Sequence, residues 1–156
     1  MERGELVAME TVLEMLKVAM MRATLRGSRG FLVDGYPREE KQGIAFESTV
    51  CPAQLCLYFR ASDSTMMQRM RKRGETSGRV DDNEFTMRER LKTFRLHSKP
   101  VVNYYRRVGK LIEVDAEASS DVVFHDTIDA MRRHLLQVSL GFWFFSLCFI
   151  FVRFFF

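Results

Sequence analysis

Two separate stretches of the chain carry side chains that could bind phosphate groups. In the first, residues 30–38, a short apolar run at 31–33 stops at Asp34, and three turn residues lead to Arg38. The run is too short for a helix and is bounded by glycine, which predicts a strand buried on both faces of a parallel sheet. Asp34 would then lie at the carboxyl end of the strand, where open α/β sheets bind ligands. There Asp34 could hold Mg²⁺ through water, and Arg38 could bind two phosphate oxygens.

The second stretch, residues 72–83, strengthens this interpretation. Taken alone, the first stretch also fits an ordinary turn with a solvated arginine. The second contains two glycines and has Arg73 and Arg79 on either side of Gly74 and Gly78. A segment of this kind could close over a triphosphate, exclude water and place positive charge where charge develops during phosphoryl transfer. The alternative is a solvated hairpin.

Length, charge and cysteine content limit the classes of protein that fit. The chain has 156 residues, of which 47% are hydrophobic, and a formal net charge of +4. These values predict one domain with a real core and suit a partner that is a polyanion, without choosing between nucleotides and nucleic acid. Cys51, Cys56 and Cys148 form no Cys-x-x-Cys pair, which disfavours a zinc site or a disulfide scaffold. With no basic and then apolar leader at the start, a reduced cytoplasmic protein is expected.

Apolar periodicity and turn residues predict the elements that position both stretches. Three-residue and four-residue spacing from Met9 to Ala23 predicts a first helix, and Pro100 should break or restart a long helical region. The remaining elements are predicted as helices at 39–46, 63–73, 84–108 and from Ser119 or Ser120 onward, and as strands at 54–59 and 110–115. Gly109 is expected to terminate the helix before it.

Residues 138–156 differ from the rest of the chain because aromatic side chains dominate them. The run approaches the ~20 residues needed to cross a bilayer. Arg153 lies near enough to its end to reach the membrane surface. The pattern fits a transmembrane anchor and equally fits a segment that folds onto nothing.

Taken together, the two stretches closely resemble adenylate kinases of the short-lid, cytosolic vertebrate type. The resemblance rests on Asp34-Gly35-Tyr36-Pro37-Arg38 and on residues 73–83, and it extends from about residue 1 to residue 136. It implies an α/β fold with three layers, in which helices flank a parallel sheet of the P-loop nucleoside monophosphate kinase type. On this basis residues 1–137 form a partial kinase core with a lid at 74–83, followed by the tail at 138–156.

The resemblance also implies phosphoryl transfer between ATP and AMP, giving two ADP, with Mg²⁺. AMP would be bound by Leu6, Val7, Arg38, Gln42, Arg79 and Arg90. ATP would be bound by Arg69, Arg73 and Ala118, the last at a position where the family has glycine. Catalysis would depend on Arg73, Arg79, Arg90 and Asp34, with Asp34 orienting magnesium-bound water.

One departure from the family concerns the phosphate-binding loop. No Gly-x-x-x-x-Gly-Lys-Ser/Thr sequence occurs in the 156 residues. In the family this loop follows a strand that lies between those matched by 31–33 and 55–59, so the sheet is predicted to lack its first strands and to be open at its centre. Two strand edges would then pair directly, stay exposed or require a partner.

These observations predict a kinase-like protein shortened at its amino end, with weak or no activity of its own because the loop supplies much of the grip on the β- and γ-phosphates. The alternative is a non-catalytic nucleotide-binding protein or kinase partner, held at a membrane by residues 138–156 if they form an anchor. Nucleic acid is not expected as a partner, because no aromatic residues alternate with the basic cluster at 69–73.

Overall fold

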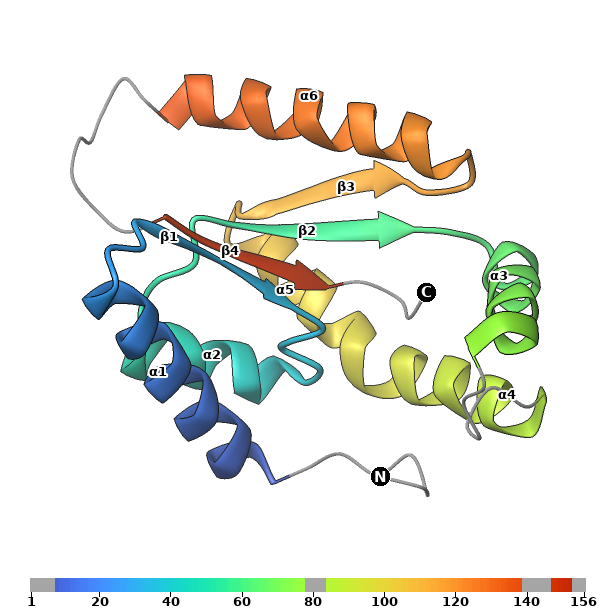
Figure 1. The fold of residues 1–156 in the computed structure, drawn as a ribbon, viewed down its shortest axis with the longest axis horizontal. Coiled ribbons are helices and arrows are strands. Elements are labelled where there is room, and N and C mark those ends of the chain that lie inside the picture. The colour runs from blue at the N-terminus through green and yellow to red at the C-terminus, as the bar shows by residue number, and fades with distance from the viewer. Residues whose placement is uncertain (1–7, 78–83, 139–146, 153–156) are drawn as a thin grey trace.

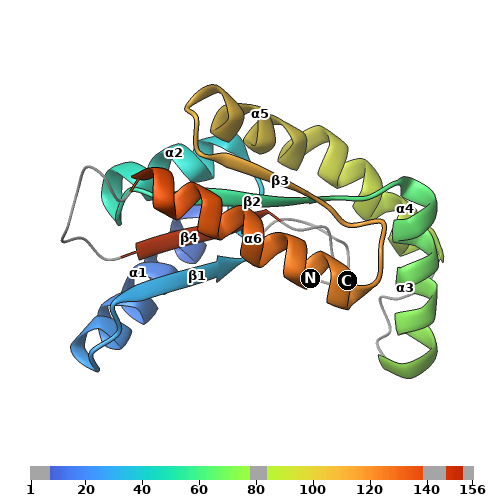
Figure 2. The same cartoon turned by 90° about the horizontal axis from the view of Figure 1, so that it is seen from above.

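The computed structural model describes residues 8–77, 84–138 and 147–152, and it confirms the predicted α/β class. A parallel sheet has α6 on one face and α1, α2 and α5 on the other (Figures 1 and 2). In chain order the elements are α1 (Met9–Leu25), β1 (Gly30–Asp34), α2 (Glu40–Thr49), β2 (Leu55–Arg60), α3 (Asp63–Ser77), α4 (Glu84–Thr93), the π-helical turn η1 (Phe94–Ser98), α5 (Lys99–Arg107), β3 (Leu111–Asp115), α6 (Ser120–Val138) and β4 (Leu147–Val152).

The sheet has the order β1-β4-β2-β3, and every adjacent pair is parallel. Asp34 of β1 lies opposite Phe151 of β4, and Phe151 also lies opposite Leu57 of β2. Arg60 of β2 lies opposite Asp115 of β3. Because all four strands run the same way, their carboxyl ends share the edge that faces α3 (Figure 1).

The aromatic tail contributes a strand to this sheet. Neither predicted alternative for residues 138–156 describes the segment Leu147–Val152, which pairs with β1 on one side and β2 on the other. No helix in the described ranges is both long and apolar enough to span a bilayer. The predicted opening at the centre of the sheet is therefore filled by β4, and β1 and β2 are not neighbours.

Two apolar cores lie on opposite faces of the sheet. On one face Val33, Phe46 and Tyr105 form a buried cluster among α1, α2 and α5. On the other face the buried side chains are those of Leu55, Leu57 and Val114, which pack with Val123 and Met131 of α6. The cores explain why the amphipathic spacing of α1 and α6 predicted these helices correctly.

Strand β1 is not buried on both faces, contrary to the prediction. Val33 is 6% exposed, whereas Leu32 is 66% exposed. Strand β1 lies at one edge of the sheet, and α6 packs against β3 at the other edge. The face that carries Leu32 therefore lacks the cover that α6 gives to β2 and β3.

Proline and glycine set the boundaries of the helices as predicted. Pro100 lies in the first turn of α5, where its missing N–H matters least, and the wider π-helical turn η1 precedes it. Gly109 adopts a φ of +72°, which a residue without a Cβ adopts readily after a helix. Helix α3 instead continues to Ser77, so residues 74–77 of the predicted lid are helical and 78–83 lie outside the described ranges.

Gly43 lies where α2 meets α5, and its replacement by alanine tests how tightly the two helices pack. A Cβ at Gly43 would lie 3.2 Å from the Tyr105 hydroxyl oxygen and 3.3 Å from Cγ of Pro37, both in buried side chains. Although alanine stabilises an open helix by roughly 1 kcal/mol relative to glycine, we expect Gly43→Ala to lower the free energy of unfolding by about 1–3 kcal/mol. Urea titration measures the change.

The control is the same substitution in a Tyr105→Phe background, which removes the nearest atom. The destabilisation by Gly43→Ala should be smaller there than in the unmodified chain. A stabilising effect of Gly43→Ala in the unmodified chain would contradict the tight packing.

Candidate functional site

The turn after β1 holds Arg38 in a defined position. Gly35 has a φ of +70°, which allows the chain to turn directly after Asp34. The Arg38 backbone N–H donates to Oε1 of Gln42 at 2.8 Å, and Nε of Arg38 donates to the carbonyl oxygen of Gly35 at 3.1 Å. The Tyr36 hydroxyl donates to the carbonyl oxygen of Gln42 at 3.0 Å. These bonds join the turn to the first residues of α2.

The π-helical turn η1 also binds the turn that carries Arg38. The hydroxyl of Ser98, in η1, donates to the backbone carbonyl oxygen of Arg38 at 3.1 Å. Ser98 is buried, and Lys99 begins α5 directly after it. The sequence carried no signal for this contact, because a single serine in a polar helical region has many ordinary uses.

Arg38 lies within electrostatic reach of both Asp34 and Arg90. The pKa of Arg38 is lowered from its usual value chiefly by burial and further by the positive charge of Arg90, while Asp34 acts in the opposite direction. Guanidinium groups stay protonated despite such shifts, so the two arginines repel each other. An anion bound between them would relieve that repulsion. Arg38, in the turn after β1, is therefore within electrostatic reach of two other predicted site residues, Asp34 at the end of β1 and Arg90 on α4.

Gln42 occupies a buried position, 4% exposed, in the first turn of α2. Its side-chain oxygen accepts the hydrogen bond from the Arg38 backbone. Gln42 is predicted to recognise a base by donating and accepting hydrogen bonds at once. The oxygen that would accept from the base already accepts from the Arg38 N–H. The amide N–H₂ of Gln42 is the group whose chemistry suits donation to a base.

Three predicted residues lie on the other half of the site, around α3 and the loop after β3. Arg69 donates to the backbone carbonyl oxygens of Glu117 at 3.2 Å and Ala118 at 2.6 Å. Arg73 lies four residues further along the same helix, on the same face. The structure thus joins Arg69 to Ala118 directly and places Arg73 one turn away.

Glu117 connects the start of α3 to this loop, and sequence analysis did not identify it. Its carboxylate accepts hydrogen bonds from the Ser62 backbone N–H and from the Thr65 hydroxyl, the latter at 2.5 Å. The bond from Thr65, followed by that from Ser62, lowers the pKa of Glu117. Ser62 also caps α3, since the Thr65 N–H donates to its hydroxyl at 3.3 Å. The contact joins segments more than fifty residues apart in the chain, so local sequence gave no sign of it.

The described residues fit a magnesium ion held mainly by water and substrate. Among them no three His, Cys, Asp or Glu side chains come together as a metal site. Mg²⁺ commonly keeps several waters and takes one or two carboxylates plus phosphate oxygens. Asp34, exposed at the carboxyl end of β1, could supply the carboxylate through water.

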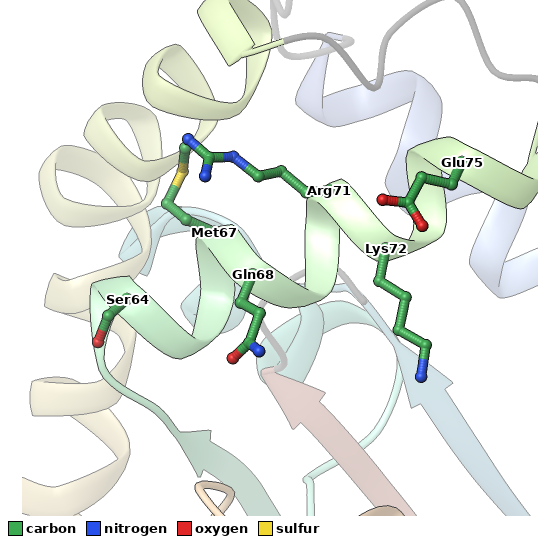
Figure 3. A pocket seen from close by; sticks show the side chains of 6 residues that line it. All are labelled: Ser64, Met67, Gln68, Arg71, Lys72 and Glu75. Carbon is green, nitrogen blue, oxygen red and sulfur yellow. The ribbon is translucent and has the colours of Figure 1, made fainter.

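Leu6, Val7 and Arg79, also predicted as site residues, lie outside the described ranges. A hollow of about 610 Å³ beside α3 does not extend the site. Its lining residues are Ser64, Met67, Gln68, Arg71, Lys72 and Glu75, all on α3. Figure 3 shows the Arg71 and Lys72 side chains extending away from each other, so their charges do not converge on one anion.

We expect Glu117→Ala to loosen the first turn of α3. At neutral pH the Ser62 and Thr65 amides should exchange with solvent faster in this variant, because the carboxylate that accepts from both residues is lost. In the unmodified chain the contact should be present above the ordinary carboxyl pKa and lost as the pH falls through the depressed pKa of Glu117. Hydrogen exchange followed by NMR measures both effects.

The matched control is Asp126→Ala, which removes an exposed carboxylate from α6. It should leave exchange at Ser62 and Thr65 unchanged. Equal exchange rates in the Glu117→Ala variant and the unmodified chain would show that the contact does not stabilise α3.

Comparison with known proteins gives a consistent match. A sequence model of the adenylate kinase family matches residues 1–110. Adenylate kinase isoenzyme 1 of Rattus norvegicus is 53% identical over 124 residues, which cover 80% of this chain and 63% of the rat protein. The human isoenzyme 1 is 49% identical over 135 residues, 85% of this chain and 69% of that protein. Adenylate kinase isoenzyme 1 of Caenorhabditis elegans is 48% identical over 124 residues, which cover 80% of this chain and 59% of that protein. The chain therefore spans less than two thirds of the rat and Caenorhabditis proteins.

Proposed function

The chain belongs to the adenylate kinase family, and on that premise we propose that it is a nucleoside monophosphate kinase-like protein with AMP and ATP as its ligands. The observation that carries the proposal is the anchored turn after β1, whose Arg38 backbone is bound by Gln42 and Ser98 and whose guanidinium is within electrostatic reach of Asp34 and Arg90. Two guanidinium groups and one carboxylate at the carboxyl edge of a parallel sheet suit a phosphate group with an associated divalent cation.

The AMP half of the site is supported by the anchored turn. Gln42 and Ser98 bind the backbone of Arg38 from two elements, which limits the freedom that its guanidinium would lose on binding a phosphate. Arg90 adds a second positive charge nearby. A phosphate monoester carries close to two negative charges, so the two arginines suit it. Leu6, Val7 and the amide of Gln42 would contact the base, and Arg79 would contact the phosphates.

The ATP half would involve α3 and the loop after β3. Arg69 and Arg73 share one face of α3, and Ala118 adjoins Arg69, so the backbone near Ala118 would face the adenine of ATP. Arg73, Arg79 and Arg90 would neutralise charge on the transferred phosphoryl group. Mg²⁺, when bound, bridges and neutralises the phosphate oxygens, and Asp34 would orient its waters. Such a site works by alignment and charge compensation and needs no covalent nucleophile on the chain.

Transfer by this chain is proposed to be weak. Its 156 residues contain no Gly-x-x-x-x-Gly-Lys-Ser/Thr sequence, whose amides and lysine hold the β- and γ-phosphates. The second candidate function is AMP binding without transfer. It is favoured by the contrast between the anchored Arg38 turn and the ATP half, which lacks that loop sequence.

Binding of AMP tests the site itself. We expect Arg38→Ala to weaken AMP binding by about 10–100-fold, because a charge-assisted hydrogen bond contributes about 1.5–3 kcal/mol. Arg73→Ala should leave AMP affinity nearly unchanged, because Arg73 lies on α3, in the half of the site proposed to bind ATP. Calorimetric titration measures both.

Arg133→Ala, a substitution at an exposed arginine on α6, controls for loss of a positive charge. If AMP fails to bind the unmodified chain at millimolar concentration, or binds the Arg38→Ala variant equally well, the proposed AMP half is wrong.

Turnover distinguishes the two candidate functions. A coupled assay with ATP, AMP and Mg²⁺ should show turnover at least about 100-fold below that of rat isoenzyme 1 assayed in parallel, because loss of phosphate-binding groups removes transition-state stabilisation of at least that size. Any residual turnover should disappear when EDTA removes Mg²⁺. Binding of AMP with no Mg²⁺-dependent turnover would favour the non-catalytic function. Turnover near that of the rat enzyme would contradict the proposed weakness.

A further inference from the structure

The end of α1 carries an exposed surface that the candidate site does not use. We call it the α1 tip and define it as Met21, Arg22, Leu25, Arg26 and Arg29. Met21 is 56% exposed, Leu25 is 82% exposed, and the three arginines are exposed as well. Met21 and Leu25 are four residues apart, as are Arg22 and Arg26, so the apolar and basic side chains form two neighbouring rows on the helix. No acidic residue occurs between positions 21 and 29.

The arginines of the α1 tip lack the ion pairs that exposed arginines make elsewhere in the protein. At the end of α5, Arg106 pairs with Glu113 and Arg107 pairs with Glu40. No carboxylate among the described residues pairs with any of the three arginines of the tip. The helix dipole favours a cation in the last turn of α1. It does not account for the large apolar side chains that are exposed beside these cations.

The backbone holds the α1 tip in a defined shape. Gly27 has a φ of +92°, and its N–H donates to the carbonyl oxygen of Thr24 at 2.9 Å. The Ser28 N–H donates to the carbonyl oxygen of Ala23 at 3.1 Å. This pair of bonds is the Schellman motif, which ends a helix and satisfies its last carbonyl groups. The tip is therefore a formed surface and does not have to fold when a partner binds.

We propose that the α1 tip binds the surface of an anionic lipid bilayer. A helix is held at such a surface by basic side chains close to the acidic headgroups and by apolar side chains inserted between them. The three arginines supply the first contribution, and Met21 and Leu25 supply the second. The formal net charge of +4 acts in the same direction. This proposal goes beyond the proposed function and does not depend on nucleotide binding.

The apolar row of the tip favours a bilayer over a nucleic acid. Proteins bind nucleic acids through cations placed against phosphates, and they bind single strands through aromatic side chains that stack on the bases. The tip has no aromatic residue. Contact with phosphates alone would leave Leu25 in water, whereas insertion into a bilayer would remove it from water.

The α1 tip lies away from the candidate site. Helix α1 leads into the start of β1, whereas the site lies at the carboxyl ends of the strands, beside α3 (Figure 1). A bilayer bound at the tip would leave the carboxyl edge of the sheet open to solvent. Binding to a bilayer and binding of a nucleotide are therefore compatible.

Sedimentation of vesicles with the full chain tests the proposal. Phosphatidylcholine vesicles that contain about 30% phosphatidylserine should bind the chain at least about tenfold more tightly than vesicles of phosphatidylcholine alone. Raising the salt concentration from about 0.05 M to about 0.5 M should release most of the bound protein, because salt screens the attraction. Equal binding to both kinds of vesicle, or binding to neither, would overturn the proposal.

The double variant Arg22→Gln, Arg26→Gln tests the basic row. Each basic residue near an anionic surface contributes about fivefold to binding, so this variant should bind the phosphatidylserine vesicles about 25-fold more weakly. The matched control, Arg132→Gln, Arg133→Gln, removes two exposed arginines from α6, on the other face of the sheet. It should bind nearly as well as the unmodified chain. Equal losses in the two variants would refute the tip as the binding surface.

A fluorescent label at position 25 tests insertion of the apolar row. Leu25→Cys labelled with a nitrobenzoxadiazole probe should emit at shorter wavelength when phosphatidylserine vesicles are added. The control is Val122→Cys, at an exposed apolar position of α6, which should show no shift. The unmodified chain, labelled in parallel, gives the signal of the native cysteines. Absence of a shift at position 25, or an equal shift at position 122, would contradict the proposal.

The variant Leu25→Ser and a duplex DNA oligonucleotide distinguish a bilayer from a nucleic acid as the partner. Leu25→Ser should weaken binding to the phosphatidylserine vesicles about tenfold, because less apolar surface is buried. Vesicle binding that Leu25→Ser leaves unchanged would argue against a bilayer. Binding of the duplex that the Arg22→Gln, Arg26→Gln variant loses, without binding to the vesicles, would make a nucleic acid the partner and overturn the proposal.

Discussion

The parallel pairing along both edges of β4 is the constraint on which the rest of the structure depends. It places β1 and β2 in one sheet, and with them the turn that carries Arg38 and the helix that carries Arg69. Each face of the sheet then has its own core, one beneath α1, α2 and α5 and one beneath α6. The candidate site needs both halves, because its arginines come from opposite sides of β4.

At the carboxyl edge of the sheet, hydrogen bonds between distant segments hold the elements that carry the candidate site residues. Ser98 and Gln42 hold the backbone of Arg38, and Glu117 holds the start of α3 against the loop that contacts Arg69. These contacts join elements that are distant in the chain. They position the guanidinium groups before any ligand binds, which is how a site limits the conformational entropy lost on binding.

Much of the fold could be predicted where local sequence determines local structure. The apolar stripe of α1, the strand ending at Asp34, the restart at Pro100 and the turn at Gly109 all follow from side-chain periodicity or backbone geometry. What could not be predicted depends on neighbours. Leu32 is exposed because of where β1 lies in the sheet order, and α3 continues through Gly74 although glycine disfavours helix. That helix packs on α4 through a cluster that includes Met66, Met70 and Met87.

The candidate site, like the fold, could be predicted only where local sequence determines the structure. Arg38 and Arg69 were found from motif and spacing, but Ser98 and Glu117 depend on contacts between distant segments that no periodicity reports. The strand at Leu147–Val152 was not predicted, because hydropathy records that a segment avoids water without recording what covers it. A membrane interior and the centre of a parallel sheet demand the same apolar composition, and only the strand pairing distinguishes them.

The position of β4 has a consequence for how the molecule assembles. Gly30, at the start of β1, pairs with Leu147, at the start of β4, and every described element except α1 lies between these two strands in sequence. During synthesis the four-stranded sheet cannot form until β4 has been made, after α6. Until then the backbone N–H and C=O groups on the inner edges of β1 and β2 lack their strand partner. Contacts between segments so distant in sequence slow folding, and strand edges that are still unpaired can bind other chains.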